Sequence, residues 1–263
     1  MKKFEELKQK YGESKKSSII VYIILRTLVI FSMVRQILRG DLNNAFLCIL
    51  SLALFTLPGI FQQKLKIKLP NVLEIIIYLF IYSAEILGEI HNFYGHIPAW
   101  DTILHTINGF LCAGIGFSLV DLLNKNSKKL NLSPLYVALV AFCFSMTVGV
   151  CWEFFEYSAD KIVKTDMQKD TLVKDVSTVY LDPNKNNKAV ILKNIGKTVI
   201  YDEQNNEMAV IDGGYLDIGI NDTMKDLLVN FIGAVTYSIL GYVYIKNREK
   251  YKFASNFIPT KAE

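Results

Sequence analysis

Long apolar runs constrain this chain more than any other feature. Six stretches of roughly twenty residues carry almost no charge, and an α-helix of about 20 residues, rising about 1.5 Å per residue, crosses the hydrocarbon core of a bilayer. They cover residues 19–38, 42–61, 71–90, 101–122, 134–156 and 224–245. A soluble helical core would need polar faces on most helices, and the runs at 44–61 and 134–152 have none. The sequence therefore predicts an all-α polytopic membrane protein with six transmembrane helices.

Lysine and arginine gather between these runs and predict an orientation, because cations next to membrane helices mark the cytoplasmic side. The basic segments are the N-terminal segment, residues 62–70, residues 124–131 and the tail after residue 245, and two spans separate each from the next. The short segments in between hold only Arg39 in 39–43 and no cation in 91–100. Frequent Lys, Ile and Asn suggest a bacterial source. We therefore expect a multi-pass protein of the bacterial plasma membrane with both termini in the cytoplasm.

These boundaries divide the chain into five parts. We expect a cytoplasmic N-terminal segment (1–18), transmembrane helices 1–5 (19–156), an extracytoplasmic insertion (157–223), transmembrane helix 6 (224–245) and a cytoplasmic tail (246–263). The first apolar run lacks a cleavage site, so we interpret it as an uncleaved span.

The insertion is too long for a simple connection. Its β-branched stretches at 189–193, 197–202 and 207–212 are separated by turn residues and predict a three-stranded antiparallel meander. Residues 166–180 are expected to form a short amphipathic helix. The result would be a small α+β insertion between helices 5 and 6.

Cysteines, glycines and net charge narrow the possible functions. All four cysteines lie in apolar runs without metal-type spacing, so we interpret them as small hydrophobic residues. The glycines at 88, 109, 114, 116, 149 and 233 are expected at close helix–helix contacts. Topology explains the lysines, and the insertion is roughly neutral, which argues against nucleic-acid binding.

Ionisable residues recur near the outer ends of four predicted helices, where each set shares a helix face. A charged side chain inside a span costs about 2.5–3.5 kcal/mol, so such groups face the bundle interior or a polar cavity. The acids and the histidine come from spans three to six: Glu85 and Glu89; Asp101 and His105; Glu153 and Glu156; Asp222 and Asp226. Arg35 and Arg39 stand opposite, and Arg35 is expected at the depth of Glu85.

A histidine among carboxylates favours a divalent metal, because several carboxylates cannot all stay ionised in one dry pocket. We predict metal ligands at His105, Glu153, Glu156, Asp222 and Asp226, without fixing the metal's identity. Substrate-binding residues are predicted at Arg35, Arg39, Glu85, Glu89 and Asp101.

Simpler interpretations stay open for several of these residues. Asp101 and Asp222 suit helix N-caps, and Glu156 would be solvated at the end of the fifth span. His91 and His96 are expected in a loop. A hydrogen-bond network that only holds the helices together would explain the deeper groups without a ligand.

The segments WEFFEYSAD (152–160) and DTMKDLLVNFIGA (222–234), after a helix with an aspartate and a histidine, resemble the YjdF-type family of bacterial inner-membrane proteins. They are also similar to related membrane-spanning proteins of Gram-positive bacteria. The resemblance covers spans three to six through Glu153, Glu156, Asp222, Asp226 and Gly233-Ala234. The insertion is a departure from it. The resemblance implies a membrane architecture with a polar cluster and no particular reaction.

Three functions follow from these patterns. A metal-dependent enzyme at the outer leaflet would act on a lipid or lipid-linked substrate entering from the bilayer. A non-catalytic membrane module would recruit a partner through its outer loop. An ion- or proton-coupled transporter would use the carboxylates as relays, although the inner half offers only Glu74 and Arg26. The oligomeric state is left open.

Overall fold

A computed structural model describes residues 16–126, 131–162, 164 and 166–261. They form two compact units: residues up to Gly149 together with those from Asp226 onward, and Val150–Lys225. We call these the helical unit and the insertion unit. Most of the predicted N-terminal segment and part of the basic segment 124–131 lie outside the described residues.

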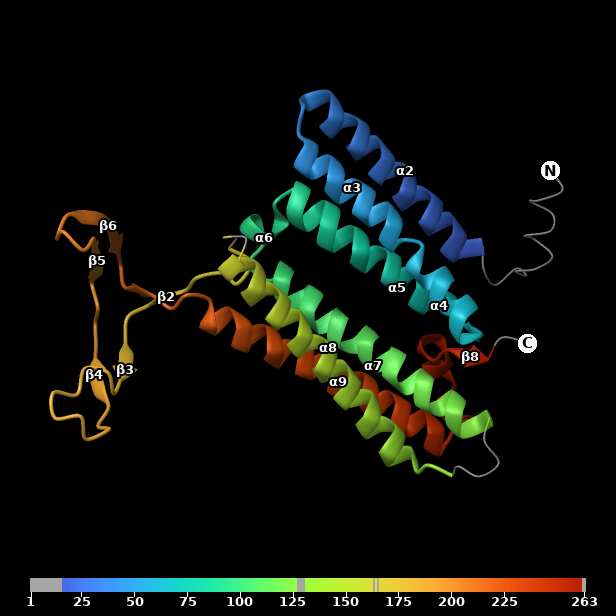
Figure 1. The fold of residues 1–263 in the computed structure, drawn as a ribbon. Helices are drawn as coiled ribbons and strands as arrows, with labels where there is room; N and C mark the ends of the chain where they lie inside the picture. Colours follow the sequence, from blue (N-terminus) through green and yellow to red (C-terminus); the bar gives the residue numbers. More distant parts are fainter. Residues whose placement is uncertain (1–15, 127–130, 163, 165, 262–263) are drawn as a thin grey trace. The chain divides into compact units, whose positions relative to one another are not determined.

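The helices follow the apolar runs of the sequence (Figure 1). They are α2 (Lys16–Arg39), α3 (Leu42–Leu54), α4 (Leu57–Leu65), α5 (Asn71–Ile81), the π-helix η2 (Tyr82–Ile90), α6 (Phe93–His96), α7 (Trp100–Asn126), α8 (Pro134–Ile162) and α9 (Ile220–Lys246). A cap fixes the start of α3, where Asp41 Oδ1 accepts the backbone N–H of Asn44 at 3.1 Å.

Among the described residues, five helical stretches are long and apolar enough to cross a membrane: Ser17–Arg39, Leu42–Leu65, Trp100–Asn124, Pro134–Ile162 and Ile220–Lys246. The remaining predicted span, 71–90, is helical throughout but changes from α to π at Tyr82, so neither part alone has the required length. Length and composition thus support five of the six predicted spans.

Large apolar side chains cover the outside of α2 and α3. Phe31 and Leu38 on α2 are 70% and 82% exposed, and Phe46 on α3 is 63% exposed. Exposing such an apolar surface is unfavourable in water and favourable in contact with lipid tails. The inner faces of these helices pack around buried Val29, Cys48 and Phe55.

Helices α7 and α9 pack with their backbones in close contact. A Cβ atom at Gly109 would lie 2.1 Å from the carbonyl oxygen of Asn230, and one at Gly233 would lie 2.0 Å from that of Thr106. Contacts advance in the same direction along both helices, so the two helices run parallel: His105 with Asp226, Gly109 with Asn230, Gly114 with Tyr237 and Phe117 with Gly241.

The six predicted close-packing glycines are confirmed, because a Cβ on any of them would come within 3.0 Å of a neighbour. The cysteines are also free, as expected, with Cys48 and Cys112 buried.

The segment after α9 folds back into the helical unit. Its 3₁₀ helix η3 (Lys252–Phe257) and strand β8 (Thr260–Lys261) follow α9, and β8 pairs with β1 (Ile67–Lys68). Ala254 and Ile258 are almost fully buried beside Phe117 and Val137. The Tyr237 hydroxyl donates to the Phe257 carbonyl at 2.8 Å. The sequence predicted only a cytoplasmic tail here.

The insertion unit contains short, paired strands. They are β2 (Leu172–Val173), β3 (Val176–Thr178), β4 (Val190–Leu192), β5 (Lys197–Tyr201), β6 (Glu207–Asp212) and β7 (Tyr215–Leu216). The pairs are β2 with β7, β3 with β4, and β5 with β6, all antiparallel.

Two predictions for the insertion need correction. The three expected strands exist, but β4 pairs with β3 instead of β5, so there is no single meander among the described residues. Residues 166–180 are extended and contain β2 and β3 instead of an amphipathic helix. Two features favour an extended backbone here. Asp217 Oδ1 accepts the N–H of Thr171 at 2.8 Å, and the β-branched residues Val173 and Val176 favour strands.

Candidate metal centre

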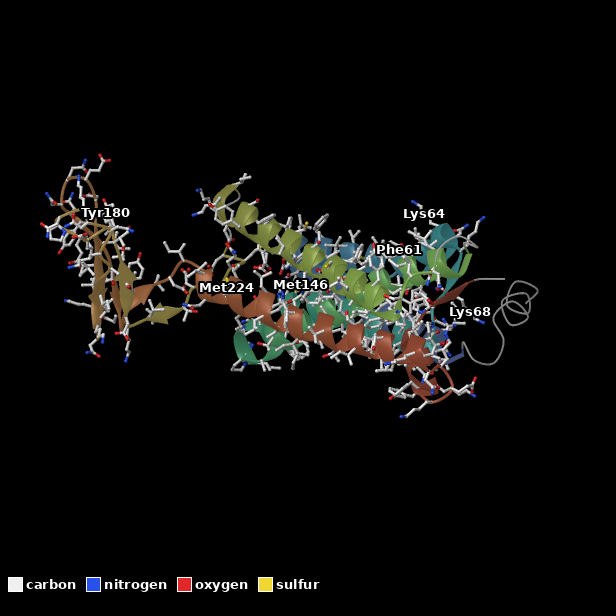
Figure 2. The ribbon with its side chains drawn as sticks, turned by 90° about the horizontal axis from the view of Figure 1, so that it is seen from below. Phe61, Lys64, Lys68, Met146, Tyr180 and Met224 are labelled. Carbon is white, nitrogen blue, oxygen red and sulfur yellow. The ribbon has the colours of Figure 1, made fainter. Side chains whose placement is uncertain are left out.

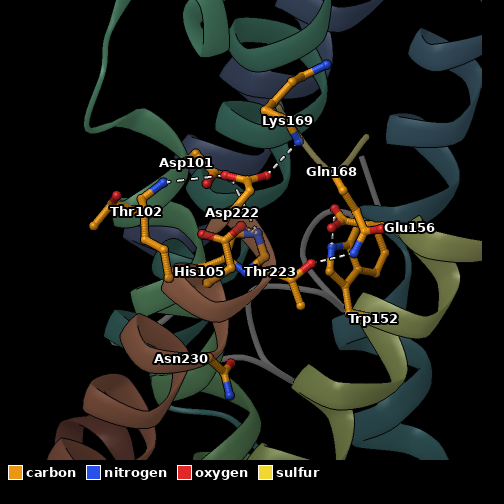
Figure 3. Close-up of polar contacts among 12 residues, drawn as sticks. Asp101, Thr102, His105, Trp152, Glu156, Gln168, Lys169, Asp222, Thr223 and Asn230 are labelled. Carbon is orange, nitrogen blue, oxygen red and sulfur yellow. Dashed lines mark hydrogen bonds and ion pairs between the residues drawn. The ribbon is translucent and has the colours of Figure 1, made fainter. Parts of the chain in front are cut away.

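His105 lies close to two aspartates in the helical unit. Its Nε2 atom is 3.4 Å from Asp101 Oδ1 and 3.8 Å from Asp226 Oδ2. Figure 3 shows His105 next to Asp101 on α7. One ligand atom from each of the three residues lies within 4.8 Å of the others.

The two parallel helices explain this convergence. Asp101 and His105 are one turn apart on α7 and therefore share a face. Asp226 approaches from α9, whose backbone is drawn close by the contacts at Gly109 and Gly233. Burial increases across the cluster: the side chains of Asp101, His105 and Asp226 are 28%, 12% and 2% exposed.

A row of polar contacts, the polar ladder, continues from the cluster toward the C-terminal ends of α7 and α9. Asn108 Nδ2 donates to Asn230 Oδ1 at 3.5 Å, and Ser145 Oγ of α8 donates to the Gly109 carbonyl at 2.7 Å. Asn230 (Figure 3) also contacts Met146, with 3.7 Å between Nδ2 and Sδ. These contacts fix the spacing of α7, α8 and α9. They agree in part with the alternative that a hydrogen-bond network only holds the helices together. The role of Ser145 was missed, because a single serine inside an apolar run has no pattern that distinguishes it from a small packing residue.

The spacing of the three ligand atoms suits a small divalent cation. Zinc takes histidine nitrogen and carboxylate oxygen at about 2.0–2.2 Å, which in a tetrahedron puts neighbouring ligand atoms about 3.3–3.6 Å apart. The two distances from His105, 3.4 and 3.8 Å, come near this range, and the ligand atoms of Asp101 and Asp226 lie within 4.8 Å of each other. Three protein ligands also leave a coordination position open, as in catalytic sites. Two carboxylates with one imidazole would offset the charge of such a cation.

Comparison with known proteins places the chain in a family. Residues 18–247, most of the chain, match the family described as predicted membrane protein (DUF2238). The chain belongs to this family. A Thermotoga maritima protein named "Uncharacterized protein" is 28% identical over 106 residues, which is 40% of this chain and 53% of that protein. The chain thus spans about half the length of this relative. No solved structure matches.

In this DUF2238 protein the remaining predicted ligands belong to the insertion unit. Glu153 and Glu156 are buried residues of α8, and the Trp152 indole N–H donates to Glu156 at 2.8 Å. Asp222 Oδ2 accepts the Lys169 backbone N–H at 2.9 Å (Figure 3). Glu156 is therefore not a solvated surface acid. The metal-binding roles of these three residues stay predictions.

The predicted helix caps also differ in detail. α7 begins at Trp100 and α9 at Ile220, so Asp101 and Asp222 lie inside the first turn instead of at the N-cap. A carboxylate in that turn still interacts favourably with the helix dipole.

The residues predicted to bind substrate are spread over the helical unit. Arg35 and Arg39 are exposed residues of α2, while Glu85 and Glu89 lie on η2. In the part of the chain that the structure describes, no ion pair joins Arg35 to Glu85. The two residues were expected at the same depth in the membrane, but their side chains do not meet. Asp101 is the residue of this set that lies at the cluster. Their substrate-binding roles stay predictions.

The other two histidines are exposed, as expected for loop residues. His91 follows the last residue of η2, and His96 ends α6, with its Nδ1 2.7 Å from the Asn92 carbonyl oxygen. These positions make them suitable controls for His105.

Proposed function

We propose that this membrane protein binds a divalent cation through Asp101, His105 and Asp226 and acts as a metal-dependent enzyme on a lipid or lipid-linked substrate. The observation that carries the proposal is the approach of His105 Nε2 to two carboxylates, 3.4 and 3.8 Å away, in helices that can span a membrane. Charged groups at such positions are costly and are typical of functional sites.

The proposed topology has six spans, with 71–90 as the third, and both termini in the cytoplasm of a bacterial cell. Lysines support this orientation: Lys64 and Lys68 project from the α4–β1 end of the helical unit (Figure 2), and Lys246 and Arg248 follow on α9 and just after it. The insertion would then be extracytoplasmic. We also propose that the chain is related to the YjdF-type proteins.

The bound cation would act as a Lewis acid on a phosphoryl or carbonyl oxygen or lower the pKa of a bound water. His105 would provide Nε2 as the nitrogen ligand, and buried Asp226 would provide the less hydrated carboxylate. Asp101, at 28% exposed, faces the more open side, where a headgroup would arrive. For Glu153, Glu156 and Asp222, a metal-binding role stays a prediction from the sequence.

The segment after α9 makes a transporter less suitable. Ile258 is 1% exposed, and the ring of Phe257 packs edge-on against Phe110 with centroids 5.7 Å apart. Phe110 lies well inside α7, so apolar side chains fill the space between the helices below the polar ladder. A path for ions through the helical unit would need this segment to move.

A partner-recruiting module is a second candidate, and the exposure of apolar residues in the insertion unit favours it. Tyr180 (Figure 2) is 91% exposed and Met208 is 69% exposed. Deletion of residues 162–215 should abolish partner capture but leave metal binding intact.

Metal analysis of the purified, full-length protein in detergent tests the proposal. After dialysis against zinc or manganese, the wild type should retain about one equivalent per chain. His105→Ala and Asp226→Asn should lose most of it, and Asp101→Asn should lose part of it. His96→Ala, an exposed histidine variant, should match the wild type. Equal metal content in wild type and His105→Ala would refute the metal centre.

A further inference from the structure

The insertion unit contains two hairpins, β3–β4 and β5–β6, that carry opposite charge. Residues 183–197, which include β4, hold four lysines and no acid, whereas residues 198–217, with most of β5 and all of β6, hold five acids and no lysine or arginine. Each hairpin is a separate two-stranded sheet (Figure 1), so each strand has one neighbour among the described residues. The outer edges of the hairpins therefore present unpaired backbone N–H and C=O groups.

Two of these edge strands match in length and are opposite in charge. β4 lies within KAVILK (188–193), and β6 is EMAVID (207–212), so four apolar residues stand between two lysines in the first and between two acids in the second. All four charged residues are exposed, and in the described part of the chain none of them takes part in an ion pair. The apolar residues are open as well, with Ile191 60% and Met208 69% exposed.

On this basis we infer that β4 of one copy of the chain pairs antiparallel with β6 of a second copy, so that two hairpins join into one four-stranded sheet. The lysine ends of β4 then meet the acidic ends of β6, and opposite charges across neighbouring strands are stabilising. Strand addition at an exposed edge is a recurring mode of recognition. The inference deepens the second candidate function, the partner-recruiting module, and does not depend on the metal centre.

The same charges disfavour other pairings between these edges. Antiparallel pairing of β4 with β4 would bring lysines together at both ends, and pairing of β6 with β6 would bring acids together, which is destabilising. β5 begins with Lys197 and is followed by Asp202, so its two ends differ in sign. Among the strands of the two hairpins, β4 with β6 is thus the pairing that is attractive at both ends.

A single chain cannot make this antiparallel pairing within itself. It would place Lys193 at the Glu207 end of β6, whereas Lys197, the first residue of β5, lies opposite Asp212 at the other end. Five residue steps along β6 cover about 17 Å and two strand spacings about 10 Å, so the two lysines would be about 20 Å apart. Four residue steps, from Lys193 to Lys197, span at most about 14 Å. The partner strand therefore comes from a second copy.

Reciprocal pairing closes the assembly as a dimer. In an interface around a two-fold axis the same two patches meet twice, so β4 and β6 of each copy would both be used. Copies inserted in one membrane with the same orientation hold their insertion units on the same side, where these strands can meet.

Charge exchange between the two strands tests the inference. The mass of the full-length protein in detergent is measured by size-exclusion chromatography with light scattering, and the wild type should be a dimer. Lys188→Glu with Lys193→Glu should raise the dissociation constant at least tenfold, and so should Glu207→Lys with Asp212→Lys. A chain with all four substitutions should dimerise again, because the attraction is restored with the signs exchanged.

Lys174→Glu with Lys185→Glu is the matched control. It changes the net charge by the same amount as the lysine pair of β4 but lies outside both edge strands, so it should dimerise as the wild type does. A monomeric wild type, a dimer that survives both charge-reversed pairs, or no recovery in the fourfold variant would overturn the inference.

Disulfide formation between copies locates the contact. Two differently tagged chains without the four natural cysteines are co-expressed, one with Ile191→Cys on β4 and the other with Val210→Cys on β6. The product that carries both tags should form several-fold more readily than with Ser177→Cys on β3, because β3 would lie one strand further away, about 10 Å from β6. Equal cross-linking from β3 and β4 would contradict the pairing.

Metal content separates this inference from the proposed function. None of the substituted residues belongs to the metal centre, so the charge-reversed variants should keep the metal content of the wild type when they are monomeric. His105→Ala should lose metal and remain a dimer. A wild type without bound metal would refute the metal centre alone, because the mass of the assembly is measured independently.

Discussion

The Cα of Gly109 lies so close to the backbone of Asn230 that a Cβ would be 2.1 Å from the Asn230 carbonyl oxygen. This contact sets the distance between α7 and α9 and thereby brings Asp226 to His105. Gly109→Ala should therefore push the helices apart, and overpacking of this kind typically costs about 1–3 kcal/mol. Thermal unfolding in detergent should show a lower midpoint.

Gly59→Ala in α4 is the matched control for that substitution. A Cβ at Gly59 meets nothing within 4 Å, so alanine should be neutral or stabilise the helix by about 0.5–1 kcal/mol. If both variants unfolded at the same temperature, the close contact between α7 and α9 would lose its support.

The hydroxyl of Tyr237 holds the segment after α9 in place through its bond to Phe257. Tyr237→Phe keeps the ring but removes a buried hydrogen bond, which should cost about 1 kcal/mol. Limited proteolysis should then cleave residues 247–261 faster than in the wild type. Tyr180→Phe, a change at a 91% exposed residue, should have no effect. Unchanged protection in Tyr237→Phe would show that apolar packing alone anchors the segment.

The carboxylate of Asp182 organises a turn of the insertion unit and makes it sensitive to acid. Backbone N–H groups of Lys188, Asn184 and Asn186 donate to it at 2.7–3.1 Å, and these bonds lower the pKa of Asp182. A lowered pKa in the folded state stabilises the turn above the ordinary aspartate value of about 3.9, and that stabilisation is lost as the pH falls through the folded-state pKa.

Amide hydrogen exchange of residues 184–188, corrected for intrinsic rates, checks this at about pH 6 and at about pH 2, well below the ordinary aspartate pKa of about 3.9. The wild type should be protected at the higher pH and lose protection at the lower one, whereas Asp182→Asn should lack most of this difference. Asp212→Asn, on an exposed strand residue, should behave as the wild type. Protection that ignores pH in the wild type would contradict the role of the carboxylate.

The proposed orientation can be tested with single cysteines in a variant that lacks the four natural ones. Tyr180→Cys should react with a membrane-impermeant maleimide added to intact cells. Lys64→Cys should react only after the membrane is opened, because Lys64 lies near the end of α4, in the basic region that the proposed orientation puts in the cytoplasm. The reverse pattern would place the insertion inside the cell.

Helix positions could be read from the sequence because apolar length is a local property. The ends of the predicted runs lie within six residues of the ends of the observed helices. The glycines at the α7–α9 contact were identified because small residues inside apolar runs mark close helix packing. His105 and Asp226 were assigned to one site, whereas Asp101, the carboxylate nearest to the imidazole, was expected to bind substrate.

Pairing over long distances was not predictable from local pattern. The strand at 190–192 has the same composition whether it pairs with β3 or β5, and only the turn geometry around it decides. Arg35 and Glu85 were matched by depth, but the rotation of each helix, which depth does not fix, determines whether side chains meet. The burial of Ile258 was missed because residues 252–261 carry no long apolar run.

The folded-back segment also bears on the order in which the protein is made. Residues 252–261 follow α9 in the chain, yet they complete a core whose other members come from α7, α8 and α9. Because chains fold from the N-terminal side during synthesis, this core stays unfinished until every helix around it has entered the membrane.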